Sequence, residues 1–221
     1  MSAESGVPTF RGEKGLWRGY RPEQLASVRA FRRNPEVVWQ WYDWRRGIVA
    51  YCEPNAAHNT LAAMEEVLCD FTLITQNVDG LHQAAGSVNV LELHGNIWRV
   101  RCTECTHFSE DRRVPFPEIP PLCPQCNALL RPDVVWFGES LAEHVLEAAW
   151  AAAARCGTML VIGTSAVVYP AASLPLEAAR SGARLIEINP VPTPLSEHAD
   201  VVVREPAARA LPDWWQAHRP T

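Results

Sequence analysis

The sequence lacks the features that mark membrane, secreted or nucleic-acid-binding proteins. It contains no run of about 18 apolar residues, so no segment is expected to span a bilayer. Its first residues, MSAESGVPTFRGEKG, have no apolar core of the kind that a secretory signal needs. The net charge is −5 and basic residues cluster only locally, which argues against a nucleic acid as partner. We therefore expect a cytoplasmic protein that binds neither nucleic acid nor a membrane.

The composition is otherwise that of a globular protein, with seven cysteines. Of the 221 residues, 48% are hydrophobic and 20% are charged, which suffices for a substantial core. This length fits one large domain, or one domain with a smaller insert. Because no export is expected, the cysteines are interpreted as metal ligands or buried thiols and not as disulfides.

Helical and extended segments alternate along most of the chain. Propensity and capping signals predict helices over 22–33, 35–50, 54–69, 141–156 and 171–181. Apolar runs predict strands over 71–75, 158–163, 184–189 and 200–203, and another within VNVLELHG. This alternation predicts an α/β fold whose parallel sheet is covered by helices on both faces. The strand ends carry TQNVD, GTS and INP, at the edge where such sheets bind ligands.

Four of the cysteines form two C-x2-C pairs that are seventeen residues apart: Cys102, Cys105, Cys123 and Cys126. Each pair makes a tight turn that directs two thiolates to one point, so two pairs complete a tetrahedral zinc site. Four cysteine ligands leave no open position, and the single zinc ion is therefore expected to be structural. The alternative is four unrelated thiols. Mixed flanking charge disfavours nucleic-acid binding by this module.

Two short motifs are ambiguous when taken alone. His94 follows a strand and suits either a hydrogen-bonded structural histidine or a catalytic one. The triplet Gly163-Thr164-Ser165 suits either a plain turn or a contact with phosphate or ribose. The order of all the motifs along the chain decides between these alternatives.

Taken together, SAESGVPTFRG, TQNVDGLH, ELHGN, the four cysteines, VVWFGE, VIGTSAVVYPAA and EINP resemble the sirtuin family over essentially the whole chain. The resemblance implies that NAD is a co-substrate and that acyl groups are removed from lysine side chains of proteins. It also implies a Rossmann-like parallel sheet with helices on both faces and an inserted small zinc-ribbon domain. The implied division is 1–21, 51–97 and 134–221 for the NAD domain, 22–50 for a helical part of the small domain and 98–133 for the zinc module.

The resemblance also implies roles for single residues. His94 would be the general base that deprotonates a ribose hydroxyl, which suits an imidazole whose pKa lies near the working pH. Asn77 would act beside it, and Val135, Trp136, Phe137 and Gly138 would pair with the substrate peptide as an added strand. The implied NAD-binding residues are Ser5, Pro8, Thr9, Phe10, Arg11, Trp17, Gln76, Asn77, Val78, Asp79, Gly163, Thr164, Ser165, Asn189, Pro190 and Ala207.

The segment WQWYDWRR carries information about the acyl group. Tyr42 and Arg45 are three residues apart, so on a helix they share one face. Sirtuins that prefer succinyl- and malonyl-lysine carry such a pair, because a guanidinium and a phenol can bind a terminal carboxylate. The alternative is a solvent-exposed arginine beside aromatic packing. We therefore predict a desuccinylase and demalonylase that retains deacetylase activity.

The sequence departs from the family pattern at its start. Sirtuins begin with an apolar strand and a GAG loop, whereas this chain opens at MSAESG. Because that strand is central in a Rossmann-like sheet, its absence is expected to leave hydrogen-bonding edges within the core. We therefore expect the natural protein to begin some residues upstream.

Two other functions remain open at this point. One is transfer of ADP-ribose from NAD to protein, which the acyl-binding pair and His94 argue against. The other is an inactive, truncated zinc-ribbon binding module or pseudo-enzyme, which the absent strand suggests. We expect the protein to be a monomer.

Overall fold

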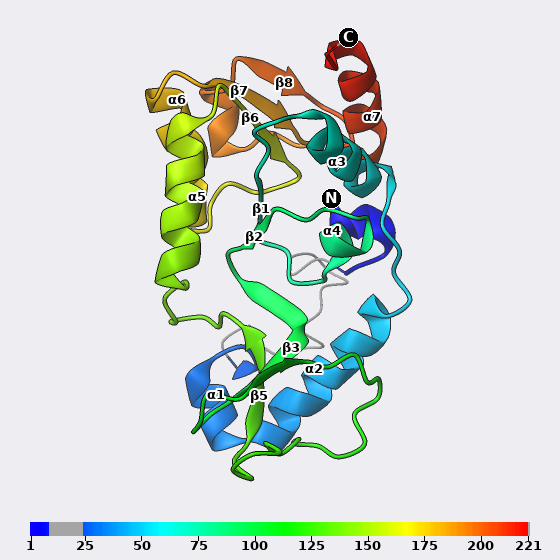
Figure 1. The fold of residues 1–221 in the computed structure, drawn as a ribbon, viewed down its shortest axis with the longest axis vertical. Coiled ribbons are helices and arrows are strands. Elements are labelled where there is room, and N and C mark those ends of the chain that lie inside the picture. Colours follow the sequence, from blue (N-terminus) through cyan, green and yellow to red (C-terminus); the bar gives the residue numbers. More distant parts are fainter. Residues whose placement is uncertain (9–23, 221) are drawn as a thin grey trace.

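The computed structural model describes residues 1–8 and 24–220 and shows an elongated protein with two lobes (Figure 1). The larger lobe, at the top of Figure 1, contains parallel strands with helices on either side. The smaller lobe combines two helices with antiparallel strands. The α/β class expected from the sequence is confirmed.

Most elements belong to the larger lobe. They are α3 (Ala56–Val67), β1 (Leu73–Thr75), α4 (Leu81–Ala84), β2 (Val90–Glu92), α5 (Glu143–Arg155), β6 (Thr158–Ile162), α6 (Leu174–Arg180), β7 (Arg184–Ile188), β8 (Val201–Val203) and α7 (Ala207–His218), with the short 3-10 helices η1 (Ser2–Ser5), η3 (Ala171–Ser173) and η4 (Pro194–Glu197). The smaller lobe contains α1 (Val28–Arg33), α2 (Pro35–Val49), β3 (Gly95–Cys102), β4 (Phe108–Glu110) and β5 (Leu130–Val134). Within residues 1–8 and 24–220, no helix is both long and apolar enough to cross a bilayer.

The predicted parallel sheet consists of two separate pieces. β1 pairs with β2, and Leu73 lies opposite Val90. β6, β7 and β8 pair in that order, and Ile186 of β7 lies opposite both Leu160 and Val201. In the part of the chain that the structure describes, β1 and β6 each have a strand partner on one edge only. Side-chain packing therefore holds the two pieces together, because Leu73 of β1 and Ile186 of β7 lie in the same apolar cluster.

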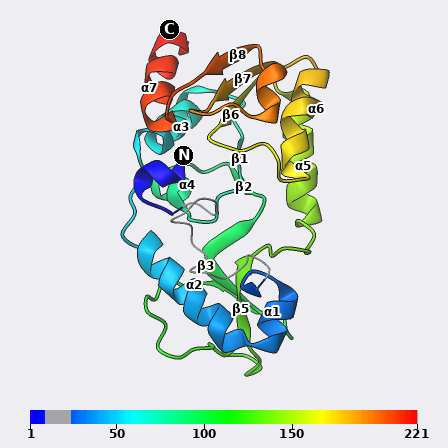
Figure 2. The same cartoon turned by 180° about the vertical axis from the view of Figure 1, so that it is seen from behind.

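Helices cover both faces of the parallel strands, which Figure 2 shows from behind. On one face, α3 and α7 pack against β1 and β7 in a cluster that includes Leu61, Ile188 and Leu211. On the other face, α5 and α6 pack in a cluster that includes Ala153 and Leu174. Burial on both faces explains why the strand sequences read as apolar runs and not as an alternation.

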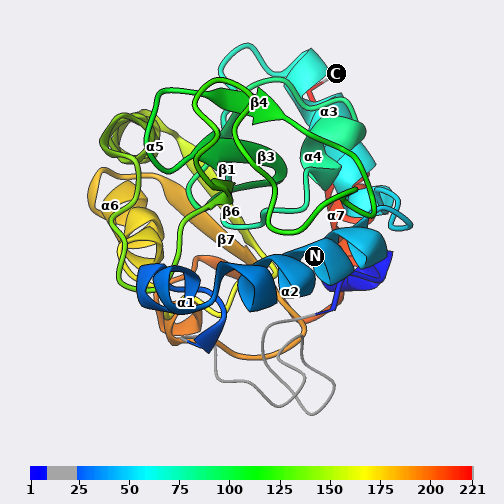
Figure 3. The same cartoon turned by 90° about the horizontal axis from the view of Figure 1, so that it is seen from below.

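The smaller lobe packs around one large cluster of buried side chains. Figure 3 shows α1 and α2 on one side of β3 and β4. The indole Nε1 of the buried Trp39 donates to the backbone oxygen of Leu130 at 2.7 Å, which joins α2 to β5. The Trp39 ring meets Phe116 edge to face at 4.9 Å. Cys102 and Cys123 belong to the same core. The helices α1 and α2 and the zinc module therefore fold around one shared set of side chains.

Some expected boundaries differ from the structure. A helix was predicted from residue 22, but α1 begins at Val28, because Ser27 caps it by accepting a hydrogen bond from the Ala30 N–H at 3.2 Å. The helices α4 and α7 were not predicted. β3 and β5 continue across the expected domain borders, and the division into domains stays a prediction.

Candidate active site and metal centre

The four cysteines converge at one point in the smaller lobe. The Sγ atoms of Cys102 and Cys126 are 3.4 Å apart, and those of Cys105 and Cys123 are 3.6 Å apart. All four sulfurs lie within 4.8 Å of one another. A tetrahedron with zinc–sulfur bonds of about 2.3 Å has edges of about 3.8 Å, so the sulfurs fit one zinc ion. The alternative of four unrelated thiols is wrong.

Hydrogen bonds favour the thiolate form of one of the four ligands, Cys102. Burial acts to raise the pKa of Cys102, but N–H groups of Glu104 and Cys105 donate to its Sγ at 3.3 and 3.4 Å. Together with hydrogen bonds from the thiols of Cys126 and Cys105, these bonds prevail and lower the pKa of Cys102 to about 6. Four sulfur ligands fill a tetrahedral shell, so a bound zinc ion would tie the loops of the module together.

His94 lies in the turn between β2 and β3 and is half-buried. Its Nδ1 is 3.0 Å from the backbone oxygen of Gln76. A carbonyl oxygen only accepts, so Nδ1 carries the proton and Nε2 is the basic nitrogen. Burial lowers the pKa of His94 below its ordinary value, although the Gln76 carbonyl opposes this. The ring is therefore neutral at neutral pH, as a general base must be.

The turn that presents His94 requires a glycine. Gly95 has a φ of +76°, and a Cβ added there would lie 2.1 Å from the backbone oxygen of Asp133. The missing side chain lets β3 and β5 approach closely. The Val135 N–H then donates to the His94 backbone oxygen at 3.0 Å. This bond places His94 directly beside the segment that was predicted to pair with substrate.

Polar side chains meet at the carboxyl ends of β1, β6 and β7. Gln76 follows β1, and its Nε2 donates to Oγ1 of Thr164 at 3.4 Å. Asn189 follows β7, and its Nδ2 donates to the Thr164 backbone oxygen at 2.6 Å. Three of the predicted NAD-binding residues thus come together, and the exposed Ser165 adjoins them. This is the edge at which open parallel sheets bind ligands.

The N-terminal segment lies against the same edge. Nδ2 of Asn77 donates to Oγ of Ser2 at 2.8 Å. Gly163 has a φ of +60°, and a Cβ added there would lie 2.6 Å from the amino nitrogen of Met1. The glycine therefore allows the close approach of the two segments, in addition to the turn after β6.

The loop after Asn77 is fixed by its own hydrogen bonds. Oδ1 of the buried Asp79 accepts from the Leu81 N–H at 3.0 Å. Its backbone oxygen accepts from the indole of Trp98 at 2.7 Å. The backbone oxygen of the buried Val78 accepts from the Ile97 N–H at 2.8 Å. The loop is consequently anchored to β3, immediately beyond His94.

The remaining predicted NAD-binding residues differ in their surroundings. Pro8 is half-buried, whereas Pro190 is exposed after β7. Ala207 is the first residue of α7 and packs in the apolar cluster between α3 and α7. Its direct contact with NAD stays a prediction. Thr9, Phe10, Arg11 and Trp17 lie outside the described residues.

Tyr42 and Arg45 lie one turn apart on α2 and are both buried, with 0% and 4% of their surface exposed. The alternative of a solvent-exposed Arg45 is therefore wrong. Burial lowers the pKa of Arg45, and the nearby Tyr42 and Asp79 oppose this effect. Because an arginine starts from so high a pKa, it keeps its charge. The two side chains place a cation and a phenol next to the loop that carries Asp79.

The segment 135–138 was expected to accept the peptide as an added strand. The Val135 N–H donates to the His94 backbone oxygen at 3.0 Å. The Trp136 N–H donates to the carboxylate of Glu139 at 2.8 Å, and the Phe137 N–H donates to the Ala26 backbone oxygen at 2.9 Å. An added strand has to displace one of these bonds or pair through carbonyl oxygens, and strand addition stays a prediction.

Comparison with known proteins decides the family. The model of the Sir2 family matches residues 1–170, which is more than half of the 221 residues. The chain belongs to the Sir2 family. It is 54% identical to an NAD-dependent protein deacylase of Aquifex aeolicus, over 96% of this chain and 88% of that protein. NAD-dependent protein deacylase 1 of Archaeoglobus fulgidus is 51% identical over 96% of this chain and 86% of its own length.

Solved Sir2 structures share the fold closely. A complex of a Sir2 homologue with NAD has a TM-score of 0.93 at 49% identity, and covers 98% of this chain and 84% of that one. A Sir2 complex with a p53 peptide and NAD+ has a TM-score of 0.87 at 34% identity, and covers 98% and 88%. The structural similarity therefore extends over both lobes of this Sir2 chain.

Sequence reasoning missed one anchor of this Sir2 chain, Asn55. Its Nδ2 donates to Oγ of Ser5 at 2.9 Å and to the Met1 backbone oxygen at 3.2 Å. Its Oδ1 accepts from the first N–H groups of α3, and Nδ1 of the buried His58 accepts from the Asn55 N–H at 3.2 Å. Asn55 thus fixes the N-terminal segment to α3. The N-x-x-H spacing before a helix is a capping-box signal that could have found it.

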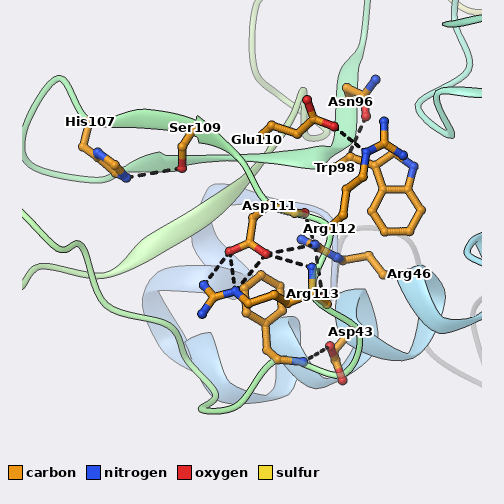
Figure 4. Close-up of polar contacts among 11 residues, drawn as sticks. Asp43, Arg46, Asn96, Trp98, His107, Ser109, Glu110, Asp111, Arg112 and Arg113 are labelled. Atoms are coloured by element: carbon orange, nitrogen blue, oxygen red, sulfur yellow. Dashed lines mark hydrogen bonds and ion pairs between the residues drawn. The ribbon is translucent and has the colours of Figure 1, made fainter.

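A second missed feature joins α2 to the zinc module (Figure 4). Arg46 of α2 is fully buried and donates to the backbone oxygen of Asp111, with its Nη2 3.7 Å from the carboxylate. Its guanidinium lies 4.3 Å from the ring centroid of Phe116. Burial lowers the pKa of Arg46 to about 10. The Phe116 N–H donates to Asp43 of the same helix at 2.8 Å. The helix that carries Tyr42 is therefore held from its zinc-module side.

Proposed function

We propose that this Sir2 protein is an NAD-dependent protein lysine deacylase. His94 carries the proposal: it is a half-buried imidazole whose Nδ1 proton is fixed by Gln76, so Nε2 is the basic nitrogen. It lies next to the strand ends where Gln76, Thr164 and Asn189 meet. The names of the relatives and the NAD complex among the similar structures support the same activity.

In the proposed reaction, NAD and water convert an acyl-lysine into lysine, O-acyl-ADP-ribose and nicotinamide. The strand ends where Gln76, Thr164 and Asn189 meet would hold the cofactor, and the Asp79 loop would bind its nicotinamide end. Nε2 of His94 would accept the proton of a ribose hydroxyl. The zinc ion, when bound to its four cysteines, supplies structure and no open coordination position.

For the acyl group, we propose a preference for succinyl- and malonyl-lysine over acetyl-lysine. Tyr42 and Arg45 support it, because a buried guanidinium beside a buried phenol can bind a carboxylate with two charge-assisted hydrogen bonds. An acetyl group gains nothing from either donor, but it is smaller and still fits the same site. Deacetylation is therefore expected to persist at a lower rate.

Rates of nicotinamide release and of peptide deacylation on acetyl-, malonyl- and succinyl-lysine peptides test the proposal. Arg45→Met is expected to lower kcat/KM for the succinyl peptide about 10- to 100-fold, as expected for loss of a hydrogen bond to a charged group. The rate on the acetyl peptide should change little. Arg32→Met, an exposed arginine on α1, is the matched control.

Two results would reject the proposal in different ways. An equal loss on both peptides would exclude Tyr42 and Arg45 as the acyl-selective pair. Label from NAD that remains on the protein, with no deacylated peptide formed, would indicate an ADP-ribosyltransferase instead.

We further propose that the substrates are acylated proteins and that the chain acts as a cytoplasmic monomer. The peptide complex of a similar Sir2 protein supports the first point. Light scattering of the purified protein tests the second, and cell fractionation tests the location.

A further inference from the structure

A buried hydrogen bond links the segment after β5 to α2. The indole Nε1 of Trp136 lies 2.9 Å from the hydroxyl oxygen of Tyr42, and the two residues are 2% and 0% exposed. An indole N–H only donates, so the phenol oxygen is the acceptor in this bond. The proton of the Tyr42 hydroxyl is therefore directed away from Trp136, toward some other acceptor.

The Tyr42 hydroxyl keeps its proton and can therefore donate it. Burial raises the pKa of its hydroxyl, while the charge of Arg45 and the Trp136 hydrogen bond act in the opposite direction. The phenol thus stays protonated at neutral pH. With Arg45 one turn further along α2, the protein presents two donors side by side, which matches the two oxygens of a carboxylate.

Trp136 is itself held firmly in place. Its N–H donates to Glu139, whose carboxylate accepts two hydrogen bonds from Arg131, at 2.6 and 2.8 Å. The Arg131 guanidinium lies 3.4 Å from the centroid of the Trp136 ring, and Phe31 contacts that ring at a centroid distance of 5.2 Å. A stacked cation and a neighbouring aromatic ring fix the plane of the indole, and so the direction of its N–H.

We propose that Trp136 is a positioning residue for acyl-group selection, which rests on the proposed function of Tyr42 and Arg45. By occupying one lone pair of the Tyr42 oxygen, its indole turns the phenol proton toward the carboxylate at the end of a succinyl or malonyl chain. An acetyl group has no such carboxylate. The effect is therefore confined to the acidic acyl substrates, and Trp136 selects among substrates without touching the acyl group.

Trp136→Phe tests this, because it removes the N–H and keeps an aromatic ring for Arg131 and Phe31. The readout is the ratio of kcat/KM for the succinyl peptide to that for the acetyl peptide, together with the ratio of the two peptide Kd values. Both ratios are independent of the folded fraction in a preparation. We expect each ratio to fall about threefold to tenfold, because the hydrogen bond from the Tyr42 hydroxyl to the acyl carboxylate is weakened but not lost.

Trp39→Phe is the matched control. It removes an equally buried indole N–H, which bonds a backbone oxygen and not Tyr42. We expect this variant to lose stability and to keep both ratios within about twofold of wild type.

A double-mutant cycle with Tyr42→Phe distinguishes the possible failures. If Trp136 acts through the phenol, Trp136→Phe changes the ratios little once the hydroxyl is gone. Unchanged ratios in Trp136→Phe, with lowered ratios in Tyr42→Phe, would overturn the positioning role and leave the proposed acyl preference standing. Unchanged ratios in Tyr42→Phe and Arg45→Met would overturn both.

Discussion

At the scale of single residues, one backbone oxygen defines the chemistry of His94. The Gln76 carbonyl accepts from Nδ1 at 3.0 Å, and this fixes both the tautomer and the direction of Nε2. Partial burial then keeps the ring neutral. Neither effect involves another ionisable side chain, so the basicity of His94 depends on the local backbone.

A pH dependence follows from this arrangement. Because the neutral ring is the active form and its pKa is lowered, the rate should stay level from neutral to mildly alkaline pH. It should fall only as the pH drops through a value below the ordinary 6.5 of histidine. Initial rates between pH 5 and pH 9 measure this, and an acid limb centred above pH 7 would contradict the lowered pKa.

His94→Ala should lower kcat by about 10²- to 10⁴-fold, the usual contribution of a general base. The exposed His144 on α5 offers a control of the same residue type. His144→Ala should keep the wild-type rate and pH profile. Retention of most activity in His94→Ala would remove the histidine from the proposed reaction.

At the scale of elements, α2 joins the acyl-binding pair to the zinc module. Trp136 donates a hydrogen bond to Tyr42, the charge of Asp79 acts on Arg45, and Arg46 extends the same helix toward Asp111. The orientation of the predicted acyl site therefore depends on three segments that are far apart in the sequence. The helix that carries the predicted acyl site is thus also part of the junction with the zinc module.

Asp111→Ala tests the junction. It is expected to lower the free energy of unfolding by about 3 kcal/mol, because the buried Arg46 guanidinium loses the carboxylate that compensates it. Arg46→Met in the same chain removes that uncompensated charge and should restore part of the loss. Chemical denaturation measures both.

The control is Glu110→Ala, which breaks the exposed pair with Arg112 and should lower the free energy of unfolding by less than about 1 kcal/mol. Equal losses for Asp111→Ala and Glu110→Ala would show that the junction is not structural.

At the scale of the whole molecule, the zinc module and the helices α1 and α2 share one core. Cys102 and Cys123 are part of that core, so metal binding and packing of the smaller lobe are coupled. His94 and the segment 135–138 lie where the two lobes meet. The metal should therefore control the geometry of the acyl-lysine site without taking part in the reaction.

Removal of zinc provides the corresponding test. A structural zinc site contributes about 10–16 kcal/mol of apparent binding free energy, so a strong chelator should unfold the smaller lobe and abolish activity. Zinc content, near-UV circular dichroism and nicotinamide release should fall together and recover when zinc is added back. A metal-free protein that keeps its fold and full activity would show that the site is dispensable.

Much of the fold could be predicted because its signals are local. The apolar runs that form β1, β6 and β7, the proline at the start of α2 and the spacing of the cysteines each depend on neighbouring residues. The helix α7 was not predicted. Pro212 lies inside it, which argues against a helix in the sequence, and packing against α3 stabilises the helix in the structure. The start of α1 was misplaced, because the Ser27 cap was not recognised.

The sequence by itself determined the α/β class, the four metal ligands, the motif order of the Sir2 family and the identity of His94 as a candidate base. Only the tertiary structure decided that Arg45 is buried, that Gln76 fixes the tautomer of His94, and that Trp136 donates to Tyr42. The last of these joins residues 94 positions apart. Periodicity and spacing report which residues are neighbours along the chain, whereas burial and hydrogen-bond direction depend on which distant segments the fold brings together.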